Sequence, residues 1–184
     1  SKKQTESKTI FVIPIAEALD KNYNLRLKEK QFIGVVTRAP AQTGREKKVT
    51  HSAVDNWAYA NKIPVFYNLN DLPQADLGIL AAYGAILPQS TISHFPLGIL
   101  NVHPSMLPDL RGASPVQAAI IRGDKQVGVS IMKMDALMDH GPIISQFSEP
   151  IEPHDTTDTL YVKLFQKSAD DLVKILPNWL EEKI

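Results

Sequence analysis

Short apolar runs alternate with longer amphipathic segments along this chain. The runs are QFIGVVT at 31–37, IPVF at 63–66, LGILAAYG at 77–84, GILNVH at 98–103 and VGVSIMKM at 127–134. Each run is apolar on both faces, which is typical of strands in a parallel sheet that is covered by helices. The hydrophobic pattern therefore predicts a buried sheet built from these runs.

Helix signals lie between the runs. Pro14 opens IAEALD, and HSAVDNWAYAN at 51–61 follows a polar stretch. Ser114 and Pro115 stand ahead of VQAAIIR as an N-cap and a first helical residue, and Gly123 is placed to end that helix. Strands that alternate with helices in this way predict an α/β fold.

The last part of the chain carries one long helical pattern. Apolar residues recur at helical spacing from about Asp155 onward, and Pro177 interrupts them near the end. We expect a helix that packs on the sheet and breaks near Pro177. Neither an internal repeat nor a linker divides the sequence, so residues 1–184 are interpreted as one domain.

Composition limits the classes of function. With 184 residues, 43% hydrophobic and 22% charged, the chain has the size and content of one globular domain. No apolar run approaches the roughly 20 residues of a membrane span, and the polar N-terminus has no apolar signal-peptide core. The chain has no cysteine, which excludes disulfides, thiolate nucleophiles and Cys-ligated zinc. We expect a soluble cytoplasmic protein with no membrane partner.

Charge is balanced over the whole chain but not locally. Twenty basic and twenty acidic residues cancel, so any nucleic-acid contact needs a local patch. The segment TRAPAQTGREKKVT at 37–50 carries Arg38, Arg45, Lys47 and Lys48 with one acid, and its Pro, Gly and Gln content predicts a long loop. A solvated charged loop is the ordinary interpretation of such a segment.

The run GILNVH ends in a pair of side chains with chemical potential. Residues i and i+2 of a strand face the same side, so Asn101 and His103 point together while Val102 points into the opposite layer. Pro104 ends the ladder and places the pair at the carboxyl edge, where open α/β sheets bind ligands. An Asn amide can donate to a developing oxyanion and a His can move a proton, which suits group transfer. A structural pair at a strand end is the alternative.

An imidazole in that role needs a carboxylate partner. Asp135 and Asp139 both follow the run at 127–134, and Gly141 lets their loop turn back toward the site. The spacing leaves the choice between the two acids open.

Three longer blocks add a family resemblance. NVHPSMLPDLRGASPVQAAIIRGD, GVSIMKMDALMDHGPII and AYGAILP resemble the folate-dependent formyltransferases over roughly Phe11 to Leu164. The resemblance implies a Rossmann-like, open, mostly parallel sheet with helices on both faces. It also implies a catalytic trio of Asn101, His103 and Asp139. No metal is implied, and the remaining histidines are interpreted as surface or loop residues: His51, His94, His140 and His154.

The family branch that the chain resembles most acts on initiator methionyl-tRNA. This implies transfer of a formyl group from 10-formyltetrahydrofolate to the α-amino group of the methionine, with no role for DNA. The implied folate-binding residues are Ala85, Ile86, Leu87, Ser105, Met106, Leu107, Pro108, Met134 and Asp135. For Ile86 and Leu87, ordinary core packing is the alternative.

The acceptor is implied by the basic segment. It resembles the loop with which this branch meets the tRNA acceptor stem, so Arg38, Arg45, Lys47 and Lys48 become candidate tRNA contacts. One alternative is a branch of the family that formylates amino-sugars of sugar nucleotides. Another is a folate- or RNA-binding module without catalysis.

The sequence departs from the family pattern in three places. SKTI passes straight into FVIPIAEAL without the family's G-T-x-x-F turn, although Phe11 to Leu19 matches the family's first helix. His140 and Pro142 replace Thr and Asp in the loop that the family writes L-D-T-G-D. The family's C-terminal β-barrel domain, which helps to hold tRNA, would begin where this chain stops.

Overall fold

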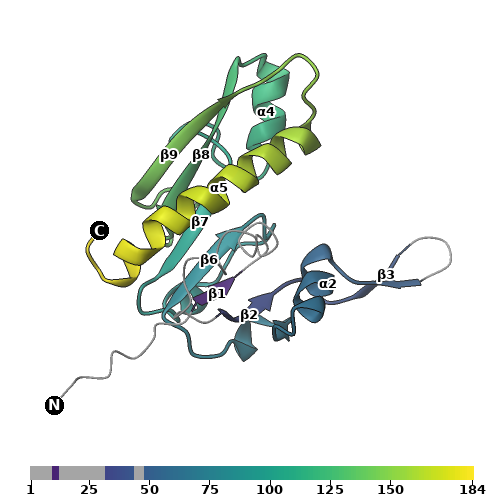
Figure 1. Cartoon of the computed structure of the whole chain (residues 1–184), viewed down its shortest axis with the longest axis vertical. Helices are drawn as coiled ribbons and strands as arrows, with labels where there is room; N and C mark the ends of the chain where they lie inside the picture. Colours follow the sequence, from purple (N-terminus) through teal and green to yellow (C-terminus); the bar gives the residue numbers. More distant parts are fainter. Residues whose placement is uncertain (1–9, 13–31, 44–47) are drawn as a thin grey trace.

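The computed structural model describes residues 10–12, 32–43 and 48–184. Its main sheet has seven strands in the order β5-β2-β1-β6-β7-β8-β9 (Figure 1). Their bounds are Ile10–Val12 for β1, Phe32–Val36 for β2, Val65–Phe66 for β5, Leu77–Ala81 for β6, Ile99–His103 for β7, Gln126–Lys133 for β8 and Ile143–Pro150 for β9. All five predicted runs contain a strand.

The sheet is mostly parallel, as expected, but not throughout. β5, β2, β1, β6 and β7 pair in parallel. β8 pairs antiparallel with β7, and β9 pairs antiparallel with β8. The apolar run at 127–134 therefore forms an antiparallel strand and not the parallel one that its two apolar faces indicated.

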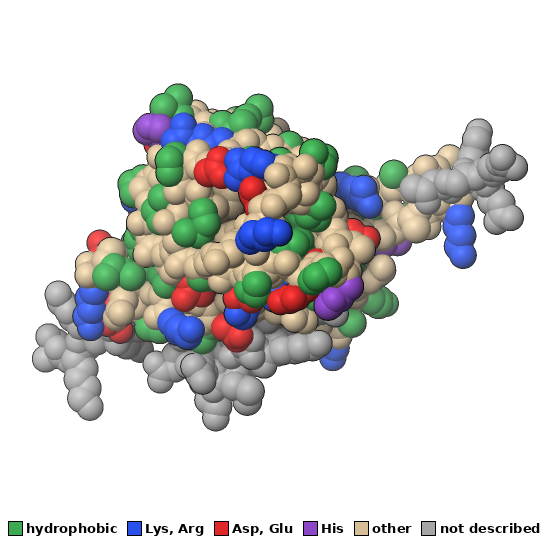
Figure 2. Space-filling model, turned by 90° about the horizontal axis from the view of Figure 1, so that it is seen from above, with side chains coloured by type: hydrophobic (Ala, Val, Ile, Leu, Met, Phe, Trp, Pro, Cys, Tyr) green, Lys and Arg blue, Asp and Glu red, His purple; other side chains and the backbone are tan. Residues whose placement is uncertain are grey.

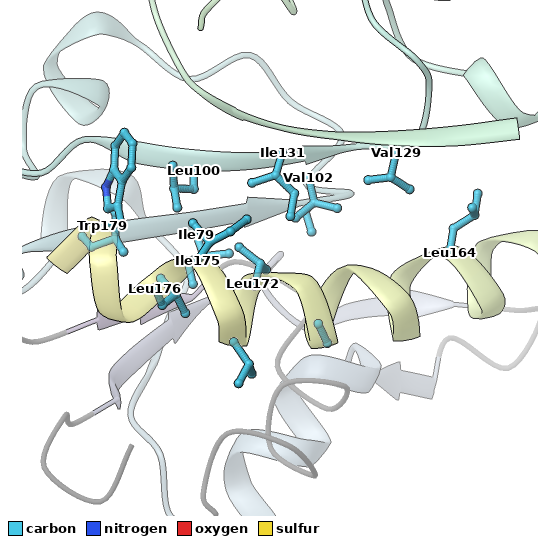
Figure 3. Packing of buried hydrophobic residues seen from close by; sticks show 14 of the residues in the cluster. Ile79, Leu100, Val102, Val129, Ile131, Leu164, Leu172, Ile175, Leu176 and Trp179 are labelled. Carbon is cyan, nitrogen blue, oxygen red and sulfur yellow. The ribbon is translucent and has the colours of Figure 1, made fainter. Parts of the chain in front are cut away.

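One face of the sheet packs against α5, which runs from Thr157 to Leu180 (Figure 3). Leu100, Val102 and Ile131 on the strands meet Leu172 and other helix residues in a single hydrophobic cluster. Burying a leucine or valine side chain contributes about 1.5–3 kcal/mol, so this layer supplies much of the stability that holds the sheet edge in place. α2 (Ala53–Ala60) and α4 (Pro115–Arg122) add residues to the same cluster.

The helix α5 does not break at Pro177, and that prediction was wrong. A capping box of Thr156 and Thr159 starts the helix, and it continues past Pro177 to Leu180. Proline lacks the N–H that would bond one turn back, but in the last turn this loses only one bond. The Pro177 carbonyl still accepts from the Glu181 N–H at 3.2 Å. At α4, the predicted stop is confirmed, because Gly123 has the left-handed conformation with φ +75°.

The second face of the sheet carries a smaller apolar cluster. Leu80 and Ile99 from the strands pack there with Leu87 and Phe95, and the short helix α3 (Gln89–Ile92) contributes Ile92. Helices therefore lie on both faces. Because side chains alternate along β7, the residues two and four positions after Ile99 face this second side.

The basic segment forms a hairpin in its described part, where a loop was predicted. β3 (Ala41–Thr43) pairs antiparallel with β4 (Lys48–Thr50). The hairpin projects from the sheet beside α2 (Figure 1). Its polar side chains gave no strand signal, since it covers no core. Two of its predicted tRNA contacts, Arg45 and Lys47, lie outside the described residues.

The start of the sheet corrects another expectation. Phe11 and Val12 were matched to a helix, but they belong to β1, which lies between β2 and β6. The rest of that expected helix, including Pro14, lies outside the described residues. In the part of the chain that is described, no helix is both long and apolar enough to cross a membrane.

Candidate active site

Asn101 and His103 lie together at the carboxyl end of β7, as the alternation predicted. Their exposed fractions are 8% and 6%, and Val102 between them is buried in the opposite cluster. His103 is the last residue of the strand, directly before Pro104. The pair is therefore held by a strand that is buried along its whole length.

The two ring nitrogens of His103 have different partners. Nε2 lies 3.0 Å from the carbonyl oxygen of Leu110, and since a carbonyl only accepts, Nε2 carries the proton and donates. Nδ1 lies 3.5 Å from Oδ1 of Asp139. The Leu110 bond fixes the ring, so Nδ1 is the nitrogen presented to the acid and to any substrate.

The position of Asp139 is set by a backbone hydrogen bond to its carboxylate and by its own left-handed backbone conformation. Its Oδ2 accepts a hydrogen bond from the Gly112 N–H at 2.9 Å, and its own φ is +47°. Gly141 closes the same loop against β8, because a Cβ there would come within 1.8 Å of the Lys133 carbonyl oxygen. Leu110 is also left-handed, with φ +51°. Left-handed residues other than glycine are strained and gather at functional sites.

The choice between the two acids is resolved by geometry. Asp135 turns away from His103: it accepts from the Leu137 N–H at 2.8 Å and from His140 Nδ1 at 2.8 Å. The bond from His140, followed by the Leu137 N–H, lowers the pKa of Asp135. Asp139 is the acid beside His103, and its catalytic role stays a prediction. His140, interpreted as a loop residue, is the ion partner of Asp135.

The predicted folate loop after Pro104 is bonded to β8 and β9. The Ser130 hydroxyl donates to the Ser105 carbonyl at 2.7 Å and accepts from the Leu107 N–H at 3.0 Å. Gln146 donates to the Leu107 carbonyl at 2.9 Å. The sequence pattern did not identify Ser130 or Gln146. The signal for Ser130 was its hydroxyl inside the apolar run at 127–134.

Met106 and Leu107 present different surfaces. Met106 is partly exposed and lies on Gly128 of β8, where an added Cβ would come within 2.3 Å of the Met106 side chain. Leu107 is buried. Pro108 is exposed and completes this loop. Only Met106 and Pro108 of these three are open to a ligand.

The segment AYGAILP, which follows β6, also contains both exposed and buried predicted folate contacts. Ile86 is 82% exposed, and Ala85 is exposed beside it. Leu87 is buried in the second cluster, against which Met134 packs. The alternative of core packing therefore holds for Leu87, while Ile86 is free to cover an apolar ligand.

The side-chain amide of Asn101 is nearly buried. Among the residues that the structure describes, no hydrogen bond to this side chain is found. A buried amide left unbonded costs about 1–3 kcal/mol, which a ligand oxygen at this position recovers. The same described residues contain no group of three His, Asp or Glu side chains arranged to hold a metal ion.

A single family model covers this whole arrangement. The formyl transferase model matches residues 10–176, from β1 almost to the end of α5. The chain belongs to the formyl transferase family. Asn101, His103 and Asp139 all lie within the matched range.

Curated members of this family are similar in sequence. A methionyl-tRNA formyltransferase of Nitrosococcus oceani is 40% identical over 168 residues, which are 85% of this chain and 52% of that protein. One from Wolbachia pipientis is 38% identical over 176 residues, 88% of this chain and 57% of that protein. The chain thus spans about half the length of the curated relatives it matches.

Solved structures share the fold at lower identity. A phosphoribosylglycinamide formyltransferase of Bacillus halodurans is 25% identical, with a TM-score of 0.75 and coverage of 92% of this chain and 95% of that one. One from Anaplasma phagocytophilum is 22% identical, with a TM-score of 0.77 and coverage of 97% and 89%. The second likeness shows the fold alone.

Proposed function

We propose that this chain transfers a formyl group from 10-formyltetrahydrofolate to the α-amino group of methionyl-tRNA. The observation that carries the proposal is the nearly buried amide of Asn101, which has no hydrogen-bond partner among the described residues and lies beside the His103 and Asp139 pair. Family membership supports the reaction class, and the similar sequences named methionyl-tRNA formyltransferase support the acceptor.

The site fits the donor through two kinds of surface. Exposed Ile86 and Met106 are proposed as apolar walls for a flat ring, with polar contacts from the backbone of the loops that follow Pro104 and Met134. The donor supplies an activated formyl group, and the protein's part is to hold it with its oxygen toward Asn101. Asp135, predicted as a folate contact, is engaged by His140 and offers mainly its backbone.

The transfer makes one bond and breaks one. The amine nitrogen bonds to the formyl carbon, the bond from that carbon to the donor nitrogen breaks, and one proton passes from the amine to the departing nitrogen. Negative charge develops on the formyl oxygen, and the Asn101 N–H and a protonated His103 Nδ1 donate to it.

Asp139 acts on this step through His103. Its carboxylate stabilises a positive charge on the ring, and the Gly112 N–H keeps that carboxylate from rotating away. A water held by Asp139 is the route that we propose for the proton. Because the Leu110 carbonyl already occupies Nε2, the ring does not need to reorient during turnover.

The acceptor is proposed to approach from the hairpin. Arg38 and Lys48 are exposed there, and in the described residues neither forms an ion pair. Arg45 and Lys47 of the same segment are proposed as further phosphate contacts. Ion pairs between these side chains and the RNA phosphates would position the acceptor without reading its bases.

A direct acceptor comparison tests the proposal. The chain is incubated with 10-formyltetrahydrofolate and, in separate reactions, methionyl-tRNA, an amino-sugar nucleotide or phosphoribosylglycinamide. We expect formylmethionyl-tRNA as the main product, formed about 10²–10³-fold more slowly by Asn101→Ala. Formylation of either small acceptor in preference to methionyl-tRNA contradicts the assigned acceptor. Folate binding without any product contradicts the assigned reaction.

A further inference from the structure

A second carboxylate is buried at the same sheet edge, outside the catalytic trio. Asp55 lies in the first turn of α2, and only 8% of its side chain is exposed. Its Oδ2 accepts from His51 Nδ1 at 2.6 Å and from the Tyr67 hydroxyl at 3.0 Å. Burying a carboxylate costs free energy unless charged or polar partners compensate. The bonds from His51 and Tyr67 provide that compensation for Asp55.

The cluster is joined firmly to the sheet. Ser52 caps α2, and its hydroxyl lies 2.8 Å from the hydroxyl of Thr37, the first residue after β2. The Thr37 N–H donates to the carbonyl of Phe66 at the end of β5. His51 directly precedes Ser52. Its backbone is therefore held where β2 and β5 end and α2 begins.

His51 presents one nitrogen outward. Nδ1 is taken by Asp55, and 48% of the side chain is exposed. Among the described residues, no hydrogen bond to Nε2 is found. In a protonated imidazole held in this way, Nδ1–H donates to the carboxylate and Nε2–H is left as an outward donor. The earlier interpretation of His51 as an ordinary surface residue does not explain this anchoring.

In the described part of the segment between Thr37 and His51, two basic residues are exposed. Thr37 and Ser52 bond across the base of the β3–β4 hairpin, which places their neighbours Arg38 and His51 at that base. Lys48 is exposed on β4. In Figure 2, Lys and Arg side chains are seen at the projecting hairpin, apart from the body of the molecule.

This corner shares an edge with the catalytic pair. β2, β1, β6 and β7 are parallel neighbours, so Thr37 and His103 stand at the carboxyl ends of strands three positions apart. Three strand spacings are about 14 Å. An extended polyanion with its reactive amine at His103 can therefore reach the hairpin base.

We infer that His51 is a contact residue for the RNA backbone of the acceptor, held by Asp55 and Tyr67 so that Nε2–H faces a phosphate. This inference rests on the proposed function. The imidazole is preoriented, in contrast to the long side chains of Arg38 and Lys48, and it loses less entropy on binding. Asp55 acts as a positioning residue.

Salt-dependent tRNA binding by the full chain tests the role of His51. The affinity for methionyl-tRNA is measured across a range of NaCl concentrations for wild type, His51→Ala and the control His154→Ala, another exposed histidine. We expect His51→Ala to weaken binding about threefold to tenfold and to flatten the slope of log K against log salt by about 0.9. A slope equal to that of His154→Ala overturns the inference.

Asp55→Asn separates positioning from simple charge. Removing a negative charge near RNA strengthens binding if only net charge matters. If Asp55 orients His51, the same change weakens binding, by about twofold to fivefold on the scale of one hydrogen bond. Tighter binding by Asp55→Asn overturns the inference, with folding of the variant checked by circular dichroism.

Formyl transfer is measured in parallel, so that the two proposals fail separately. Wild type that formylates methionyl-tRNA, with His51→Ala unchanged in affinity and slope, leaves the proposed function standing and rejects the role of His51. Wild type that neither binds nor formylates methionyl-tRNA rejects both.

Discussion

His103 and Asp139 meet through a single pair of atoms, Nδ1 and Oδ1, which lie 3.5 Å apart. The other oxygen of Asp139 is bonded to the Gly112 N–H, and the other nitrogen of His103 is bonded to the Leu110 carbonyl. Both backbone groups belong to one loop after β7. That loop sets the orientation of the imidazole and of the carboxylate together.

This relationship predicts a difference between the two acids of the loop. We expect Asp139→Asn to lower kcat about 10²-fold or more, because the charge that stabilises a protonated His103 is lost. Asp135→Asn, the matched control, removes an exposed pair with His140 and is expected to change kcat by less than about threefold. Steady-state kinetics with saturating donor measure both. Near-normal turnover by Asp139→Asn with loss of activity in Asp135→Asn reverses the assignment.

Gly141 has no side chain that could contact a substrate, yet we expect its replacement by alanine to reduce activity. An alanine Cβ would come within 1.8 Å of the Lys133 carbonyl oxygen, so the loop that carries Asp139 has to move. Displacing a catalytic group by about 1 Å can cost about 10²-fold in rate. We expect Gly141→Ala to keep its helical circular dichroism while kcat falls at least tenfold. Full activity in a folded Gly141→Ala protein shows that the loop position is not limiting.

The exposed side chain of Ile86 predicts a selective effect on the donor. Ile86→Asp places an unpaired carboxylate against an apolar ligand surface, and we expect the Kd for the folate to rise at least tenfold. Ile121→Asp is the control, since Ile121 is equally exposed on α4. Fluorescence titration measures both affinities. Equal folate affinity in the two variants removes the end of β6 from the donor site.

The bond from Tyr67 to Asp55 predicts a shift that can be measured at high pH. Burial, followed by the hydrogen bond and the charge of Asp55, raises the pKa of Tyr67. A raised tyrosine pKa means that the contact stabilises the fold fully below the ordinary tyrosine pKa, and that this contribution is lost as pH rises through the raised value. We expect Asp55→Asn to lower the pKa of Tyr67. Ultraviolet titration measures it, with Tyr67→Phe identifying the signal, and an unchanged pKa contradicts the bond.

The sequence predicted those features that depend on side-chain pattern. The apolar runs located five strands, and the alternation along β7 placed Asn101 and His103 on one face. The hydrophobic pattern did not identify β9, because Ile143–Pro150 is an edge strand with few buried residues and no two-faced apolar pattern. The direction of β8 was also beyond the pattern, since a strand buried on both faces looks the same in either direction.

The features that determine the site geometry are mostly backbone features. The spacing left Asp135 and Asp139 equivalent, and they are separated by the left-handed turn at Asp139 and the N–H of Gly112. The carbonyl of Leu110 carries no side-chain signal at all. The His51 and Asp55 pair was visible as two titratable residues one helical turn apart, but the burial of Asp55 follows only from packing.

Single-turnover formyl transfer to methionyl-tRNA tests the central claim most directly. Wild type and Asn101→Ala are mixed with saturating 10-formyltetrahydrofolate and limiting methionyl-tRNA, and formylmethionyl-tRNA is counted against time. Because the Asn101 amide is a nearly buried donor at the site with no partner among the described residues, we predict rapid product formation by wild type and a rate about 10²–10³-fold lower for the variant. Equal rates in the two proteins, or no formylmethionyl-tRNA from wild type, would contradict the account.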